Sequence, residues 1–332
     1  MRILSFWSHT WKTWLGIIFG SLFLYLACRK ADIHGTWQTL YAANHVYLIP
    51  TVVLTVGSIL LRAYRWGFLL RAIQNIEFSY LFSATSIGLM ANNLLPARLG
   101  EFVRAYDIGR RNINAASAFA TIVVERILDL SALLSFLAVI LVLFPFPGWM
   151  ARSGYLLFLL NAAALGFLVL LRVSPNKVER FCASITGPIP GRLPNRLMDL
   201  LRSFIHGLKV LGDVWGLVIA GVLSVGLWLM MGLAVWSCCL AFGFSLPIYA
   251  PLVILVIISA GIMIPSAPGF VGTFQFFSVK GLSLFGVSGD QALSFSIAFH
   301  ATQFIPVTLI GLFCLWVSSV SLRQAVRAKA EA

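Results

Sequence analysis

Long apolar runs separated by short basic stretches dominate the chain. Runs of spanning length occur in six places, at residues 14–28, 47–61, 115–144, 154–171, 214–242 and 291–320. A helix that crosses a bilayer needs about 20 mostly apolar residues. The pattern therefore predicts six helices that each span a membrane.

Two further apolar stretches, 81–95 and 247–285, are interrupted by Pro and Gly. Pro removes a backbone donor and Gly lowers helix propensity, so we expect each stretch to break into two half-helices. An alternative stays open, in which these residues only kink ordinary spanning helices. The residues of the two predicted breaks are Pro96, Gly100, Pro265, Pro268, Gly269 and Gly272.

The predicted fold class is an all-α polytopic membrane protein. It has six full spans plus two Pro/Gly-broken re-entrant helix pairs, which makes about eight membrane segments. We expect residues 1–332 to form a single transmembrane domain. Residues 172–213 are predicted to be a cytoplasmic loop that contains an amphipathic helix at 196–210.

Composition and charge support this class and set the orientation. The chain is 60% hydrophobic and only 11% charged, so water is not its main solvent. Its net charge is +13, but the basic residues lie at the edges of apolar runs rather than in one block of the kind that binds nucleic acid. Of 24 Lys and Arg residues, nineteen fall on the side of the N-terminus, four on the other side and Arg126 within a span. Positive residues stay cytoplasmic. We therefore expect an inner-membrane protein with both termini cytoplasmic, whose two broken elements enter from opposite faces in an inverted arrangement.

Polar residues in or beside the apolar segments are the candidate functional residues. Glu125 and Asp129 share a helix face at i and i+4, and Glu125 lies roughly 15 Å from the start of its span, near the middle of a bilayer core. Ionised groups there are costly unless paired, so nearby arginines should offset them. A purely structural polar clamp between helices is the open alternative. The candidate residues for binding a lipid headgroup are Asn92, Asn93, Arg98, Glu101, Arg104, Glu125, Arg126, Asp129, Ser266, Gln275 and His300.

The sequence shows no pattern typical of catalysis or of metal binding. Its five cysteines have no paired metal-ligand spacing, and four of them lie in or beside apolar runs, where they resemble small hydrophobic residues. Neither a nucleophile-and-base motif nor a nucleotide-binding loop is present. We expect no metal, no cofactor and no enzyme activity.

Three ordered motifs carry a resemblance to a known family. They are Asn-Asn-Leu-Leu-Pro-Ala-Arg-Leu-Gly-Glu at 92–101, Glu-Arg with Asp129 at 125–129, and Pro-Ser-Ala-Pro-Gly-Phe-Val-Gly at 265–272. From about Ser8 to Ala325 the chain resembles the flippase-like membrane family related to the N-terminal transmembrane region of lysylphosphatidylglycerol synthases. The resemblance implies a lipid flippase-like helical bundle. Family members usually have an acidic residue where Gln275 stands, which puts a proton-titrating role at that position in doubt.

Three functional hypotheses follow. The first is a transporter that moves an anionic or glycosylated lipid through a polar groove, with Arg98 and Arg104 on the phosphate. The second is an enzyme or enzyme subunit that uses Glu125 or Asp129 as a base, and the third is a non-catalytic partner or regulator of a lipid-synthesis or glycosyl- or aminoacyl-transfer enzyme. Aminoacyl-lipid synthesis is not expected, because no soluble transferase region follows the last span. The expected partners are membrane lipids, together with a second copy of the chain or a lipid-synthesis enzyme, and not nucleic acid.

Overall fold

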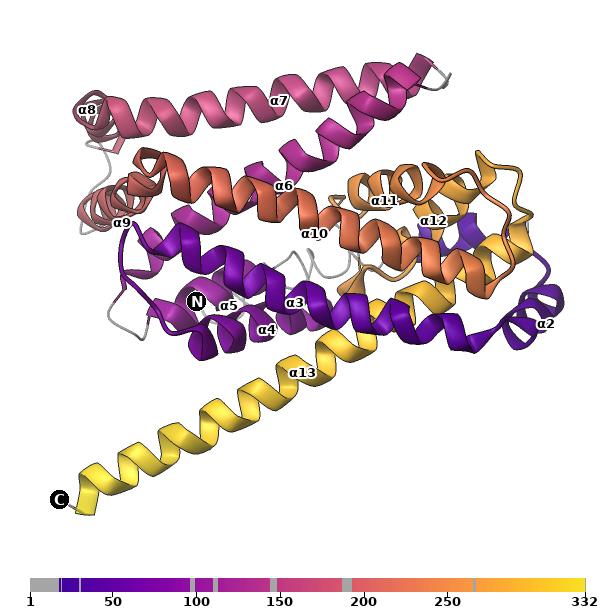
Figure 1. Ribbon diagram of the computed structural model, residues 1–332. Helices are drawn as coiled ribbons and strands as arrows, with labels where there is room; N and C mark the ends of the chain where they lie inside the picture. The colour runs from indigo at the N-terminus through magenta and orange to yellow at the C-terminus, as the bar shows by residue number, and fades with distance from the viewer. Residues whose placement is uncertain are drawn as a thin grey trace. The chain divides into compact units, whose positions relative to one another are not determined.

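All regular elements in the described part of the chain are helices (Figure 1). A computed structural model describes residues 18, 20–29, 31–95, 99–109, 113–143, 148–186, 193–264 and 267–331. Four predicted site or break residues lie outside the described residues, namely Pro96, Arg98, Pro265 and Ser266.

Four helical segments are long and apolar enough to cross a membrane. They cover His45–Leu70, Arg152–Val173, Val214–Ala241 and Gly289–Ser318. Each contains or closely matches one of the predicted spans. The predicted span at 115–144 forms helix α6 (Ala115–Leu143), which is not among these four, and most of the span at 14–28 lies outside the described residues. The all-α membrane fold is confirmed, whereas the count of six spans stays a prediction.

The surface of α7 (Gly148–Val173) is typical of a helix that faces lipid. Large apolar side chains on it are more than half exposed, including Phe158 at 60% and Leu159 at 65%. Contiguous exposed apolar surface of this kind marks contact with a membrane or a partner in a folded protein. The exposed apolar surface of α7 therefore agrees with a helix that is surrounded by lipid.

Contacts along the backbone divide the chain into two compact units. Unit 1 comprises Met1–Ile59, Ser86–Gly100 and Leu229–Ala332, and unit 2 comprises Leu60–Thr85 and Glu101–Trp228. The boundaries fall inside α3 (Leu48–Leu70), α4 (Phe78–Leu94), α5 (Gly100–Gly109) and α10 (Val214–Ala241).

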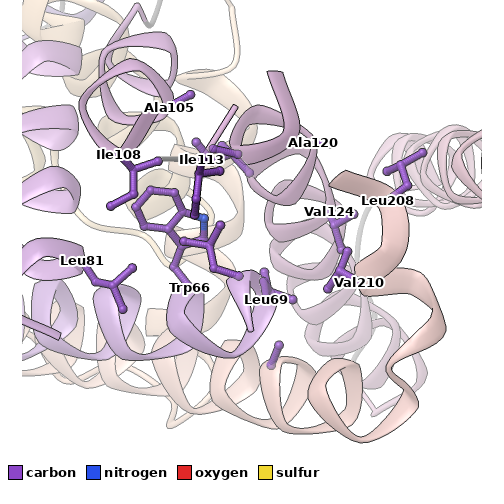
Figure 2. Close-up of a cluster of buried hydrophobic side chains, with 14 of the residues drawn as sticks. Trp66, Leu69, Leu81, Ala105, Ile108, Ile113, Ala120, Val124, Leu208 and Val210 are labelled. Carbon is purple, nitrogen blue, oxygen red and sulfur yellow. The ribbon is translucent and has the colours of Figure 1, made fainter. Parts of the chain in front are cut away.

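Unit 2 is built around α6 and one apolar core. Besides parts of α3, α4, α5 and α10 it contains α7, α8 (Pro175–Thr186), α9 (Leu193–Gly207) and the 3₁₀ turn η3 (Leu208–Gly212). Figure 2 shows part of its core, with the fully buried Trp66 among aliphatic side chains from several helices. The indole N–H donates to Thr121 Oγ1 at 2.9 Å. Because the buried indole keeps a hydrogen-bond partner, Trp66 determines which sides of α3 and α6 pack against each other.

Unit 1 has an aromatic core. It contains α2 (Ile33–Ala42), η1 (His45–Tyr47), α11 (Ala250–Gly261), η4 (Pro268–Phe270), α12 (Thr273–Ser283) and α13 (Gly289–Glu331). Phe299 on α13 packs against Phe274 on α12, with ring centroids 5.9 Å apart. Ser294 on α13 donates to the Thr36 carbonyl of α2 at 2.7 Å, which ties these helices together.

The second interrupted stretch forms α11, the short η4 turn and α12, which confirms that it is a broken helix. Residues 81–94 of the first stretch lie in α4, and a separate helix, α5, begins at Gly100, so the two helices lie on either side of the predicted break at Pro96. The entry of the two stretches from opposite membrane faces stays a prediction.

The segment 172–213 contains more helix than the sequence predicts. The expected helix at 196–210 is present as α9 followed by η3, but α8 occupies residues that were assigned to the loop. Apolar residues at i, i+3, i+4 and i+7 from Val178 lie along one side of α8. Of these, Val178 packs on the core of unit 2.

Candidate functional site

A cluster of buried charges in unit 2 is centred on two carboxylates of α6. Glu125 is fully buried, and the side chain of Asp129 is only 5% exposed. The two residues lie one helical turn apart, so both carboxylates project from the same face of α6. Every described acidic or basic side chain within ion-pair distance of them belongs to unit 2.

Arg65 of α3 joins the two carboxylates. Its Nη2 lies 2.9 Å from Glu125 Oε1 and donates to Asp129 Oδ2 at 3.2 Å, while Nη1 donates to Asp129 Oδ1. Nη1 also donates to Ser224 Oγ on α10 at 2.7 Å. Because the Arg65 side chain has no solvent exposure, the two carboxylates and the Ser224 hydroxyl compensate for its lost hydration.

Arg104 of α5 forms a bidentate ion pair with Glu125. Nη1 donates to Oε1 at 3.1 Å and Nη2 donates to Oε2 at 2.9 Å. The guanidinium carbon also lies 3.7 Å from the centroid of the Trp66 ring. A bidentate pair with a cation–π contact fixes Arg104 strongly in place.

Arg126 and Glu101 form the exposed edge of the cluster. Arg126 donates to Glu125 and lies 3.3 Å from Asp129, yet its side chain is 35% exposed. Its Nε is 3.8 Å from the carboxylate of Glu101, which is 24% exposed. This long, partly hydrated pair is the weakest ion pair that Arg126 makes.

The cluster carries more positive than negative charge. Four arginines surround three carboxylates, which leaves a net charge of +1. The fourth arginine is Arg62 of α3, whose Nη1 lies 3.9 Å from Asp129 Oδ2, its one ion pair with a described carboxylate. Trp228 on α10 donates its indole N–H to Asp129 Oδ1 at 3.2 Å. The carboxylate oxygens of Glu125 and Asp129 are therefore satisfied, whereas the arginines retain donor capacity.

The first helix break is held by an asparagine. The Gly100 N–H, at the start of α5, donates to Asn92 Oδ1 at 2.8 Å. A Cβ at Gly100 would lie 1.9 Å from the Gly88 carbonyl oxygen, so only glycine permits this approach of α5 to α4. Asn93 instead donates to Thr308 Oγ1 of α13 at 3.0 Å.

The second helix break is held by Gln275 and His300. Gln275 Oε1 accepts from the Gly272 N–H at 2.7 Å, and its Nε2 lies 3.0 Å from His300 Nδ1. His300 Nε2 lies 2.8 Å from the Gly269 carbonyl, which can only accept, so Nε2 is protonated and Nδ1 accepts from Gln275. Both Gly269 (φ 69°) and Gly272 (φ 86°) have left-handed backbone conformations that favour glycine. Each break is thus capped by a side-chain amide, Asn92 in the first and Gln275 in the second.

Among the described residues, no group of three or more His, Cys, Asp or Glu could hold a metal ion.

Comparison with known proteins gives the family. Residues 13–311 match the family described as the lysylphosphatidylglycerol synthase TM region. The chain belongs to this family. The predicted resemblance is therefore confirmed over most of the sequence.

Archaeal membrane proteins are among the relatives of this chain. A UPF0104 membrane protein of Methanothermobacter thermautotrophicus is 25% identical over 303 residues, covering 86% of this chain and 89% of the relative. UPF0104 membrane protein MJ1595 of Methanocaldococcus jannaschii is 22% identical over 321 residues, covering 92% of this chain and 95% of the relative. Glycosyltransferase AglD of Haloferax volcanii is 25% identical over 351 residues, covering 95% of this chain but 56% of AglD. No solved structure shows a significant match.

The structure brings some predicted site residues together and separates others by role. Glu101, Arg104, Glu125, Arg126 and Asp129 meet in the charge cluster of unit 2. In unit 1, Asn92, Asn93, Gln275 and His300 hold helix breaks or helix contacts through the hydrogen bonds described above. Roles in headgroup binding stay a prediction for all of them.

Sequence reasoning missed two arginines of the cluster. Arg62 and Arg65 lie just beyond the predicted span at 47–61 and count among the nineteen residues of the predicted cytoplasmic side, but α3 continues to Leu70 and buries Arg65 completely. The apolar run Trp-Gly-Phe-Leu-Leu at 66–70 was the available signal. Without Arg62, Arg65 and Arg104, the nineteen residues of the predicted cytoplasmic side fall to sixteen, still against four.

Proposed function

We propose that the protein is a lipid transporter of the inner membrane that moves a phospholipid or lipid-linked substrate, with both termini cytoplasmic. The charge cluster of unit 2 is the observation that carries this proposal. A buried network with a net charge of +1 and a partly exposed arginine suits the phosphate of a lipid headgroup. Membership of the lysylphosphatidylglycerol synthase TM family supports a lipid-related role.

The strength of the ion pairs indicates where a headgroup would bind. Removing one partner from a fully buried pair, such as Arg65 with Glu125, costs about 3–5 kcal/mol. Opening an exposed pair costs about 0–1 kcal/mol. The Arg126–Glu101 contact, at 3.8 Å and partly hydrated, is much closer to the second case. A lipid phosphate would therefore exchange with Glu101 at Arg126 and leave the buried pairs intact.

The position of Glu101 links this exchange to the first broken helix. Glu101 is the second residue of α5 and follows directly after the Gly100 that Asn92 caps. Released from Arg126, its carboxylate would lie beside a helix N-terminus, which favours negative charge. Phosphate binding at Arg126 and a local adjustment at the start of α5 are thus coupled in this proposal.

A lipid translocation assay tests the proposed function. Purified protein is reconstituted into vesicles with fluorescent lipids of different headgroups, and quenching by an impermeant reductant reports the lipid that changes leaflet. We expect faster exchange for at least one phosphate-bearing lipid than in vesicles reconstituted without the protein. Equal rates for the full panel would contradict transport by this chain alone.

A second candidate function is a non-catalytic partner of a lipid-linked synthesis enzyme. It is favoured by the match to AglD, a protein named as a glycosyltransferase, over 95% of this chain and only 56% of AglD. This region in AglD coexists with further sequence in one chain. If translocation is absent, binding of this chain to a membrane glycosyltransferase from the same cell would support the second candidate.

A further inference from the structure

A cavity between α3 and α4 lies on a different side of α3 from the charge cluster. Its volume is about 600 Å³, within the usual range of ligand sites, roughly 300–1,000 Å³. Tyr64 and Arg71 line it from the α3 side. Arg65 and Arg71 are six residues apart, and at about 100° per residue they point in directions about 120° apart around the helix axis. The cavity is therefore not part of the cluster that the proposed function uses.

The polar side of the cavity has an arginine that forms no ion pair with any residue that the structure describes. Arg71 is exposed, and in the described part of the chain it pairs with no carboxylate, including Glu77 on the same connection. Its guanidinium carbon lies 4.2 Å from the centroid of the Phe68 ring, and the Tyr64 ring meets Phe68 edge-on at 5.1 Å. The exposed Asn75 also lines the cavity and has no side-chain hydrogen bond to a described residue. An oriented guanidinium and a free amide are suitable donors for phosphate oxygens.

The other side of the cavity is apolar. Ile76, Phe78 and Leu81 line it, and Leu81 is only 3% exposed. A small inorganic anion would gain nothing from these side chains. An anionic group that carries a hydrocarbon chain would use both sides at once.

The location of the cavity agrees with such a ligand. The candidate span His45–Leu70 ends directly before Arg71, so Arg71 lies at the level where headgroups meet the hydrocarbon core. Basic residues at a span end attract anionic lipids.

We propose that this α3–α4 cavity binds one anionic phospholipid. The phosphate lies on Arg71 and Asn75, and the first part of an acyl chain lies against Phe78 and Leu81. This site is separate from Arg126 and does not depend on lipid translocation.

Photocrosslinking tests the site locally. The protein is placed in phosphatidylcholine nanodiscs that contain a small fraction of phosphatidylglycerol with a photoreactive acyl chain, and labelled peptides are identified by mass spectrometry. We expect labelling within residues 64–81 that falls about fivefold in Arg71→Gln, since one interfacial basic residue contributes about that factor in lipid binding. Asn75→Ala should give a smaller loss, and it decides the question if Arg71→Gln does not fold.

The matched control is Arg196→Gln on α9. Arg196 is also an exposed arginine of unit 2, and it does not line the cavity. Its replacement should leave the labelling unchanged, and excess unlabelled phosphatidylglycerol should abolish labelling while glycerol phosphate should not. Equal labelling of Arg71→Gln and the unmodified protein would overturn the proposal. So would an equal loss in Arg196→Gln, or competition by glycerol phosphate alone, which would indicate an anion site without lipid specificity.

Discussion

Glu125 is the residue whose replacement should reveal the energetics of the charge cluster. It accepts hydrogen bonds from Arg104 and Arg126 and forms an ion pair with Arg65, all without solvent exposure of its own. Glu125→Gln keeps the size of the side chain but removes its charge. Four arginines would then face two carboxylates, and the net charge of the cluster would rise from +1 to +2.

The expected destabilisation is about 3–5 kcal/mol, because unpaired buried charges remain. At about 1.4 kcal/mol per tenfold change, even the lower value shifts the unfolding equilibrium by roughly 100-fold. The measurement is reversible unfolding in mixed micelles by titration with a denaturing detergent, followed by circular dichroism. The matched control is Glu179→Gln, which removes a carboxylate from an exposed pair with Arg202 at 3.0 Å and should change stability by about 0–1 kcal/mol.

A second variant separates charge imbalance from lost packing. Arg104→Gln combined with Glu125→Gln returns the cluster to a net charge of +1, so the pair should be less destabilising than the sum of the two single changes. Residues in one ion-pair network usually couple by about 0.5–3 kcal/mol. Additive effects, or a Glu125→Gln protein as stable as Glu179→Gln, would refute the reasoning that the buried charges depend on one another.

Three further predictions address the helix break, the first predicted headgroup contact and the topology. Gly272→Ala should destabilise the protein by at least about 1–3 kcal/mol in thermal melting, because φ is 86° and a Cβ would lie 1.9 Å from the Gly20 carbonyl oxygen. The control Gly226→Ala, whose Cβ would meet nothing within 4 Å, should be neutral or stabilising, and equal melting of the two variants would be evidence against a strained break. Arg98→Ala should melt near the unmodified temperature but lose lipid translocation, with partial rescue by Arg98→Lys, and a collapse of stability would exclude the contact role. Single cysteines near Arg192 and Arg327, in a protein without native cysteines, should resist an impermeant thiol reagent in intact cells, and labelling from outside would reverse the topology.

The sequence was sufficient for the fold class because a bilayer forces a simple pattern on a helix. Apolar length predicted the four helices that are long and apolar enough to cross a membrane, and the Pro and Gly positions predicted both helix breaks. The helical spacing of Glu125, Arg126 and Asp129 also predicted contacts within α6, where Arg126 does lie 3.3 Å from Asp129.

The rest could not be read from the sequence because it depends on long-range packing. A buried, paired arginine and a solvated loop arginine have the same sequence signature, so Arg65 was assigned to a connection although it pairs with residues sixty or more positions away. The hydrogen bonds of Gln275 with His300 likewise join α12 to α13. Local patterns predict the elements, whereas tertiary packing decides which polar residues meet.

The most direct test of the proposed function is translocation by Arg126→Gln. This variant removes the partly exposed guanidinium at the edge of the cluster and lowers the net charge from +1 to 0, and Arg202→Gln, 59% exposed in unit 2, serves as the control. A charge-assisted hydrogen bond contributes about 1.5–3 kcal/mol. We therefore predict that Arg126→Gln, measured on the folded and reconstituted protein, loses translocation of the phosphate-bearing lipid by about tenfold or more, although the variant also removes ion pairs to Glu125 and Asp129 and melts below the control. Unchanged translocation by a folded Arg126→Gln protein would contradict headgroup binding at the charge cluster.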